Sequence, residues 1–275
     1  MSEAIKGTMI SYRPDIKVLD ATIRDGGLVN NFAFTDDFVR KLYLTNVRAG
    51  VDVMEIGYLA DPELFDESKF GKWKFCHEDA IRAVLGDILD PSLQLAVMAD
   101  VGRANVARDL PDKKDSILDM VRIATYINTI PAAIEMIETC AKKGYHTTVN
   151  IMAVSKAQES ELNEALEMLG KSSVEVIYLV DSYGSLYPLQ IRQLAERYLA
   201  AAEKYGKQIG IHAHNNQQLA FANTTECAMM GVSYLDATMA SMGRGAGNCA
   251  MELLLGFLKN PKYDIKPVLR FLQDE

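Results

Sequence analysis

Short apolar or β-branched runs alternate with longer amphipathic stretches along the whole chain. Eight such runs are present, and their starts lie 24 to 42 residues apart, at residues 16–25, 51–58, 93–100, 117–127, 146–155, 174–182, 208–215 and 232–240. Each interval has room for one helix and two loops, as a right-handed crossover between parallel strands requires. The pattern therefore predicts an α/β fold, a (β/α)8 TIM barrel.

The helices between these runs have recognisable ends. Residues 35–49 begin with Thr-Asp-Asp, and residues 188–205 begin with a proline, which suits the first turn of a helix. A glycine closes four of the helical stretches just before a strand, as expected of a left-handed C-cap, at Gly50, Gly144, Gly206 and Gly231. Residues 100–116 read instead as a polar loop with a short or missing helix. No linker divides the chain, so we expect one domain over residues 1–275, with its core at about 16–260.

Composition excludes several classes of protein. The 275 residues are 49% hydrophobic and 24% charged, which is typical of a globular domain, and the net charge of −8 has the wrong sign for a nucleic-acid partner. Four separated cysteines favour a reducing cytoplasm. The first 15 residues contain no signal-peptide apolar region, and no run is long enough to span a membrane. Assembly into a homo-oligomer is left open.

Two of the four histidines, His212 and His214, lie two residues apart in the seventh predicted strand. Residues two apart point to the same face of a strand, so both imidazoles can reach one metal ion. A histidine in a strand is often a satisfied core residue. Here the pair ends a barrel strand, where catalytic groups of such barrels are found, and we favour metal binding.

The first predicted strand ends with Arg24, Asp25, Gly26 and Gly27. In an ordinary strand this would be a surface ion pair. In a closed ring of eight strands, however, strand 1 adjoins strand 8 and strand 8 adjoins strand 7, so Asp25 should lie near both histidines. The two glycines are expected to let backbone approach a ligand.

The segment after the eighth strand, residues 241–248, is a glycine-rich loop that opens a helix. Such a loop is a weak signal for phosphate binding and is as often only a flexible connection. Asn248 at its end is placed to complete a metal site with Asp25 and His212.

Glu55 is a carboxylate in an otherwise apolar strand, and Arg24 on the neighbouring strand is its expected partner. This pair either serves catalysis or only ties two strands together. Asp181 at the end of the sixth strand either orients an imidazole or caps the following helix.

Together, Arg24-Asp25-Gly26, Glu55, His212-x-His214-Asn215 and the glycine loop before Asn248 resemble the DRE-TIM metallolyases. The resemblance extends over nearly the whole chain. Members include 3-hydroxy-3-methylglutaryl-CoA lyase, 4-hydroxy-2-oxovalerate aldolase and isopropylmalate synthase, which make or break a carbon–carbon bond beside a carbonyl. It implies Mn²⁺ or Mg²⁺ held by four residues, namely Asp25, His212, His214 and Asn248. It also implies that Arg24 binds the substrate carboxylate or the enolate oxygen and that Glu55 holds Arg24.

The loop before Asn248 has no cysteine, unlike that of the acyl-CoA lyases, so the chain is more similar to the hydroxy-oxo-acid aldolases. We expect a stand-alone aldolase or lyase that acts on a small 2-oxo acid. Substrate contacts are expected from Arg24, Gly26, Gly245 and Asn215. Two alternatives remain. One is an acyl-CoA-dependent synthase or HMG-CoA lyase-like enzyme, and the other is a non-catalytic relative that keeps its metal and oxo-acid site.

One family feature is missing. The 4-hydroxy-2-oxovalerate aldolases have a histidine base three residues after the metal-binding aspartate, where this chain has Leu28. Leucine cannot move a proton. Tyr183 is the side chain we expect to replace it, with Tyr58, His77 and a metal-bound water as the other candidates.

Overall fold

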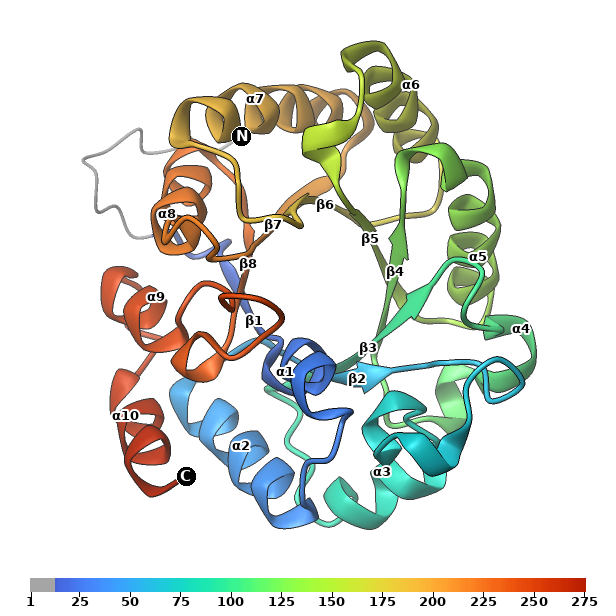
Figure 1. Ribbon diagram of the computed structural model, residues 1–275, viewed down its shortest axis with the longest axis vertical. Coiled ribbons are helices and arrows are strands. Elements are labelled where there is room, and N and C mark those ends of the chain that lie inside the picture. Colours follow the sequence, from blue (N-terminus) through green and yellow to red (C-terminus); the bar gives the residue numbers. More distant parts are fainter. Residues whose placement is uncertain (1–12) are drawn as a thin grey trace.

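The computed structural model describes residues 13–275, in which eight parallel strands close into a barrel in chain order (Figure 1). β1 pairs with both β2 and β8, which closes the ring. The strands are β1 Lys17–Asp20, β2 Val53–Tyr58, β3 Gln94–Asp100, β4 Met120–Thr125, β5 His146–Ile151, β6 Val176–Asp181, β7 Gln208–Ala213 and β8 Tyr234–Ala237. The predicted (β/α)8 barrel is confirmed, although each of the eight strands is shorter than its apolar run.

The helices surround the ring of strands (Figure 1). α10 follows α9 and lies beside α2, so the two ends of the barrel sequence meet on one side. The bounds are α1 Thr22–Asn30, α2 Asp36–Ala49, α3 Glu78–Leu85, α4 Val106–Asp109, α5 Ile130–Lys142, α6 Glu159–Gly170, α7 Pro188–Tyr205, α8 Ala220–Met230, α9 Met251–Phe257 and α10 Ile265–Asp274.

The expected helix ends are confirmed. The hydroxyl of Thr35 accepts a hydrogen bond from the Phe38 amide and caps α2, and α7 has the predicted bounds. All four glycines expected after helices have a positive φ, at 74° for Gly50 and 65° for Gly206. The loop after β3 carries only short helical segments, the one-turn helix α4 and a 3-10 turn at Lys113–Asp115, which fits the predicted short helix.

The first strand is the main correction. β1 ends at Asp20, and Arg24 and Asp25 lie in the first turns of α1 rather than at a strand tip. The Asp20 carboxylate accepts the Thr22 amide, which turns the chain out of the sheet. The two glycines, Gly26 and Gly27, are helical. A Cβ on Gly27 would lie 2.1 Å from the Phe32 ring, so the close approach that this glycine permits is to a side chain.

The interior of the barrel is layered. Its lower part is apolar, with Leu19, Val53, Ala96 and Met120 in one buried cluster. One step further along two of these strands come Glu55 and Arg122, both fully buried. Side chains two apart on a strand share a face, so these charges lie directly above the apolar layer. The interior is thus built to hold charge near the carboxyl ends of the strands.

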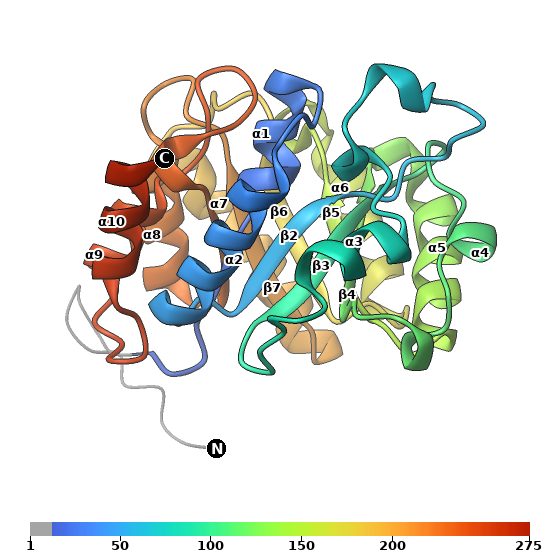
Figure 2. The same ribbon diagram turned by 90° about the horizontal axis from the view of Figure 1, so that it is seen from below.

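Figure 2 shows α1 and the segment between β2 and α3 on the same rim of the barrel. This is the rim where the strands end and where functional groups of such barrels gather. No helix within residues 13–275 combines the length and apolar character needed to cross a membrane. The predicted absence of a signal sequence rests mostly on residues 1–12, which lie outside the described part of the chain.

Candidate active site

Six buried ionisable side chains form a closed ring of hydrogen bonds at this rim. They come from α1 and from β2, β4, β7 and β8, and none is more than 4% exposed. In order around the ring they are Arg24, Glu55, Arg122, Asp236, His212 and Asp25. Each member has two neighbours in the ring, so its orientation is determined from both sides.

Glu55 joins two arginines. Its Oε2 accepts from Arg24 Nε at 2.7 Å and from Arg122 Nη1 at 2.9 Å. Arg122 also donates to Asp236 at 2.6 Å and lies with its guanidinium carbon 4.4 Å from the centre of the Tyr178 ring. The expected Arg24–Glu55 pair is therefore present, but as one part of a network that includes Arg122.

Asp236, and not Asp181, orients His212. His212 Nδ1 lies 2.9 Å from Asp236 Oδ2, which fixes this nitrogen as the donor and directs Nε2 toward Asp25. Asp181 instead accepts the amides of Ser185 and Leu186 and shapes the loop before α7, close to the alternative role as a cap. Of the two roles left open for Asp181, the structure does not show the orienting one, because this carboxylate is bound by the amides of its own loop.

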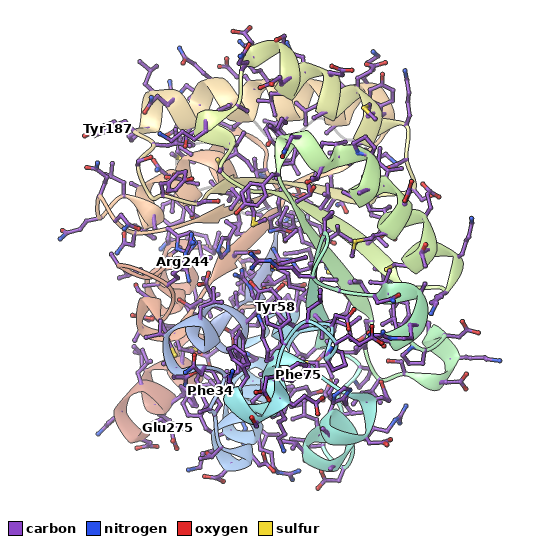
Figure 3. All side chains as sticks on the ribbon, turned by 45° about the vertical axis from the view of Figure 1, so that its right-hand side comes forward. Phe34, Tyr58, Phe75, Tyr187, Arg244 and Glu275 are labelled. Carbon is purple, nitrogen blue, oxygen red and sulfur yellow. The ribbon has the colours of Figure 1, made fainter. Side chains whose placement is uncertain are left out.

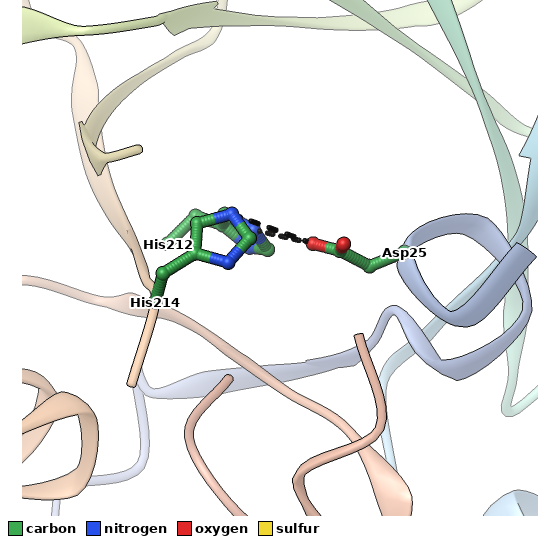
Figure 4. A group of neighbouring side chains, drawn as sticks. All are labelled: Asp25, His212 and His214. Atoms are coloured by element: carbon green, nitrogen blue, oxygen red, sulfur yellow. Dashed lines mark hydrogen bonds and ion pairs between the residues drawn. The ribbon is translucent and has the colours of Figure 1, made fainter. Parts of the chain in front are cut away.

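Asp25, His212 and His214 converge from opposite sides of one small space (Figure 4). Their ligand atoms all lie within 4.8 Å of one another. Asp25 Oδ2 is 3.0 Å from His212 Nε2 and 3.7 Å from His214 Nε2, while its other oxygen accepts the Arg244 amide. The predicted convergence of this carboxylate with both imidazoles is confirmed.

The electrostatics of the three groups suit a cation. Burial acts to raise the pKa of Asp25, but Arg24 and the imidazoles outweigh it and hold that pKa below its usual range. Burial lowers the pKa of His214 to about 4, so its imidazole is neutral near pH 7. An ionised carboxylate and neutral imidazole nitrogens are the forms in which these groups bind metals.

Asn248 offers a fourth possible ligand atom beside the three of Asp25, His212 and His214. A backbone bridge joins His214 and Asn248, and a Cβ on Gly243 would lie close to both the Asn248 amide and the Asp25 carboxyl carbon. Asn248 Nδ2 donates to Met242, whereas Oδ1 is buried and has no partner within residues 13–275. A buried oxygen that accepts no hydrogen bond destabilises the folded protein unless a bound ion or water interacts with it. One carboxylate oxygen, one amide oxygen and two imidazole nitrogens form a donor set that fits a divalent cation.

The net charge of the ring also favours a bound cation. Three carboxylates and two guanidiniums leave one negative charge in excess when the imidazoles are neutral. Both nitrogens of His212 face carboxylates, which raise its pKa against the effect of burial. A proton on His212 Nε2 would therefore lie between this nitrogen and the Asp25 carboxylate. A bound divalent cation would take the place of that proton.

A cavity of about 250 Å³ opens above this group. Arg24, His212 and His214 form part of its lining, and Arg244 closes one side, with its guanidinium donating to the Ser182 carbonyl. In Figure 3 both Arg244 and Tyr58 lie toward the centre of the molecule, whereas Tyr187 projects at its edge. The cavity is the size of a small acid rather than of a large cofactor.

Three expected substrate contacts lie elsewhere. Gly26 and Gly245 line a separate open groove of about 450 Å³ between α1 and the glycine-rich loop. Asn215 accepts the Ala220 amide at the start of α8 and donates its own amide to Gly247. The structure thus brings Arg24 to the cavity with the histidines but does not bring these three residues there.

The candidates for a general base differ in whether they line this cavity. Tyr183 is 48% exposed, lies outside the cavity lining and has the Lys156 ammonium over its ring. His77 is exposed and pairs with Glu67. Leu28 and Tyr58 do line the cavity. Burial raises the pKa of the Tyr58 hydroxyl well above its ordinary value, which makes it a poor base.

Sequence reasoning missed four residues here. Arg122 and Asp236 complete the ring, and Lys74 and Asp100 line the cavity. Arg122 and Asp236 are charges within apolar strands, the same signal that drew attention to Glu55. Lys74 belongs to a loop segment, and nothing in its sequence neighbours marks it.

The chain is similar in sequence and in fold to several known proteins. A family model described as HMGL-like matches residues 15–271. An oxaloacetate decarboxylase of Mycobacterium tuberculosis is 28% identical over 88% of this chain and 69% of its own length. A 4-hydroxy-2-oxovalerate aldolase of Pelotomaculum thermopropionicum is 25% identical over 92% of this chain and 72% of its own. The solved HMG-CoA lyase of Brucella melitensis superposes with a TM-score of 0.73 at 14% identity, covering 94% of this chain and 96% of that one.

Proposed function

Because this chain belongs to the HMGL-like family of lyases, we propose that it uses a divalent cation to cleave or form a carbon–carbon bond beside the carbonyl of a small 2-oxo acid. The observation that carries the proposal is the meeting of Asp25, His212 and His214 beside Arg24 at one cavity. Asp25, His212, His214 and Asn248 would hold Mn²⁺ or Mg²⁺. When bound, the cation would act as a Lewis acid that chelates the 2-oxo acid and stabilises charge at its carbonyl oxygen.

Arg24 supplies the second positive group. Glu55 holds its Nε and Asp25 holds its Nη1, so the guanidinium plane is fixed before any substrate enters. A preorganised donor is worth most where negative charge develops in a water-poor site. Arg24 is therefore assigned to the substrate carboxylate or to the oxygen of the developing enolate.

Replacing Arg24 with lysine keeps a positive charge but removes the planar fork that Glu55 and Asp25 hold. We expect kcat to fall by more than KM rises, because the lost contact is strongest in the transition state. Steady-state kinetics on a substrate that the wild type cleaves provide the measurement. An unchanged kcat would reduce Arg24 to a structural partner of Glu55.

Asp100 is assigned as the general base. It is the one carboxylate among the described residues that line the cavity, and its Oδ1 is buried without a hydrogen-bond partner there. Burial raises its pKa, opposed by Lys74, which brings the carboxyl closer to the pH at which it works. In the cleavage direction its ionised form would take the proton from the hydroxyl of a 4-hydroxy-2-oxo acid.

Asp100→Asn keeps the shape of the side chain but cannot accept that proton. We expect kcat to fall by roughly 10²- to 10⁴-fold, as for other removed general bases, with metal binding unchanged. In the wild type the rate should rise with pH through the pKa of Asp100, because only the carboxylate is active. Tyr183→Phe is the matched comparison and should retain the wild-type rate and profile, since that ring lies outside the cavity. The opposite ranking of the two variants would restore Tyr183 as the base.

The proposed activity is tested by incubating the Mn²⁺- or Mg²⁺-loaded protein with a panel of 4-hydroxy-2-oxo acids, with and without acetyl-CoA. The expected result is release of pyruvate that a chelator abolishes and that does not need acetyl-CoA. Cys249, whose burial raises its thiol pKa to about 12, offers no reactive cysteine for acyl-CoA cleavage. Turnover only with acetyl-CoA would favour a synthase. Binding of metal and oxo acid without any turnover would favour a non-catalytic relative.

A further inference from the structure

The ammonium of Lys74 lies within a cage of aromatic rings at the wall of the cavity. The four ring centres are 4.6 to 5.7 Å from Nζ, and they belong to Phe32, Tyr58, Phe65 and Phe70. Aromatic faces carry partial negative charge and favour a cation at this distance. The cage therefore holds Lys74 in a defined position as an ammonium.

The backbone beneath the cage is also fixed. Lys74 ends the short helical turn η2, Lys72–Lys74, which packs directly on β2. Gly57 has φ 148°, and a Cβ there would lie 1.9 Å from the Trp73 carbonyl oxygen, so only glycine permits this approach. The Lys74 carbonyl accepts the Ala60 amide. The position of the ammonium thus follows from strand β2 rather than from a free loop.

The ammonium has no charged partner of its own. Residues 13–275 provide neither an ion pair nor a hydrogen-bond acceptor for Lys74, although its side chain is only 8% exposed. Arg103 lines the same cavity, and it too lacks an ion pair in the described chain. With Asp100 as the single carboxylate nearby, this wall has an excess of positive charge. A desolvated, unpaired cation that faces a cavity is a binding site for an anionic group.

We propose that Lys74 binds a second carboxylate of the substrate, so that the preferred substrates are 4-hydroxy-2-oxo dicarboxylic acids. The inference rests on the proposed function, because that function orients the molecule. Arg24 and the metal ligands take the carboxylate and carbonyl at one end, and Asp100 takes the proton of the 4-hydroxyl. The substituent on C4 must then lie beside Asp100, where Lys74 and Arg103 are the unpaired cations.

The chemical step balances with these groups. Asp100 accepts the hydroxyl proton as the C4–O bond becomes a carbonyl, and the C3–C4 bond breaks. Its electron pair passes to C3 and the C2 carbonyl, giving an enolate whose oxygen faces Arg24. Return of this proton from Asp100 to C3 then yields pyruvate and restores the carboxylate, and the other product is a carbonyl compound that retains the C4 carboxylate. No oxidant or reductant is needed.

A matched pair of substrates tests this assignment. 4-Hydroxy-2-oxoglutarate and 4-hydroxy-2-oxopentanoate differ only by a carboxylate in place of a methyl group on C4. We expect the wild type to prefer the dicarboxylate in kcat/KM, and Lys74→Met to lose roughly 10- to 100-fold of that preference. Lys74→Arg should retain part of it. Lys204→Met, at the far end of α7 and also beside an aromatic ring, is the control and should change nothing.

Binding of the unreactive analogues gives a second readout that does not depend on turnover. 2-Oxoglutarate and 2-oxopentanoate lack the 4-hydroxyl, and calorimetric titration into the Mn²⁺-loaded protein should show the same loss of discrimination in Lys74→Met. Both variants are first compared by thermal unfolding, and Lys74→Arg serves alone if Lys74→Met does not fold. Cleavage of both substrates with no preference, or with one that Lys74 substitutions leave unchanged, overturns the inference and leaves the proposed function intact. If the protein cleaves neither substrate, both the inference and the proposed function are overturned.

Discussion

Replacing His214 with alanine is expected to abolish stoichiometric binding of a divalent cation while the barrel stays folded. His214 contributes little to the fold, because its Nδ1 has no partner within residues 13–275 and its Nε2 only faces Asp25 at 3.7 Å. Loss of a direct ligand should weaken metal binding by more than the roughly 10- to 100-fold typical of residues that only orient a ligand. Calorimetric titration with Mn²⁺, with thermal unfolding of the same samples, measures both effects.

Two other histidine variants sharpen this result. His146→Ala removes an exposed imidazole that pairs with Glu175 at the start of β5, and it should bind Mn²⁺ like the wild type. His212→Ala should lose metal and also stability, since His212 is a member of the buried ring. Wild-type metal content in His214→Ala would show that the assignment of this ligand is wrong.

The largest effect on stability is expected from Arg122→Met. Arg122 is fully buried and neutralises Glu55 and Asp236 at once. Its removal leaves Asp236 without a guanidinium partner and Glu55 with Arg24 alone, and breaking a buried pair typically costs about 3–5 kcal/mol. This is a large fraction of the roughly 5–15 kcal/mol by which folded domains are stable. Denaturant unfolding should show a lower midpoint with the same slope.

The double variant Arg122→Met/Asp236→Asn separates charge from packing. If the loss comes from uncompensated charge, removal of one carboxylate should recover part of it, so the two substitutions will not add. Arg197→Met, which breaks an exposed pair with Glu159, is the control and should have little effect. A loss in Arg122→Met no larger than in this control would contradict the view that the ring holds the barrel interior together.

Periodicity was sufficient for the barrel because its physical basis is local. A strand buried on both faces needs a short apolar run, and a crossover needs an amphipathic helix that ends before the next strand. Gly50 and Gly206 mark such ends with a backbone that few other residues adopt. The same logic placed His212 and His214 on one face and Asp25 within reach, because strand order in a closed ring is given by chain order.

The first helix could not be read in this way. Gly26 and Gly27 have low helix propensity and suggest a turn, yet both lie within α1. The packing of Phe32 and Met242 against them overrides that preference, since a side chain at either position would collide with these residues. The Met242 contact comes from a distant part of the chain and leaves no local signal.

The buried ring contains more residues than the sequence predicted, again because contacts between distant parts of the chain leave no local signal. A single charge in an apolar strand, such as Arg122 or Asp236, indicates that a partner exists but not which one. The pairing depends on strand register and on how far each side chain reaches across the barrel interior. The cage around Lys74 is harder still, because its rings come from the turn after α1, from β2 and from the loop after β2.

The central claim is that this chain holds one divalent cation where a 2-oxo acid binds. Calorimetric titration of Mn²⁺ into the metal-free protein, with and without pyruvate, tests it most directly. The account predicts one Mn²⁺ per chain and tighter binding when pyruvate is present, because the acid and the cation would share the site beside Arg24. The absence of a saturable Mn²⁺ site, or an affinity that pyruvate does not change, would contradict it.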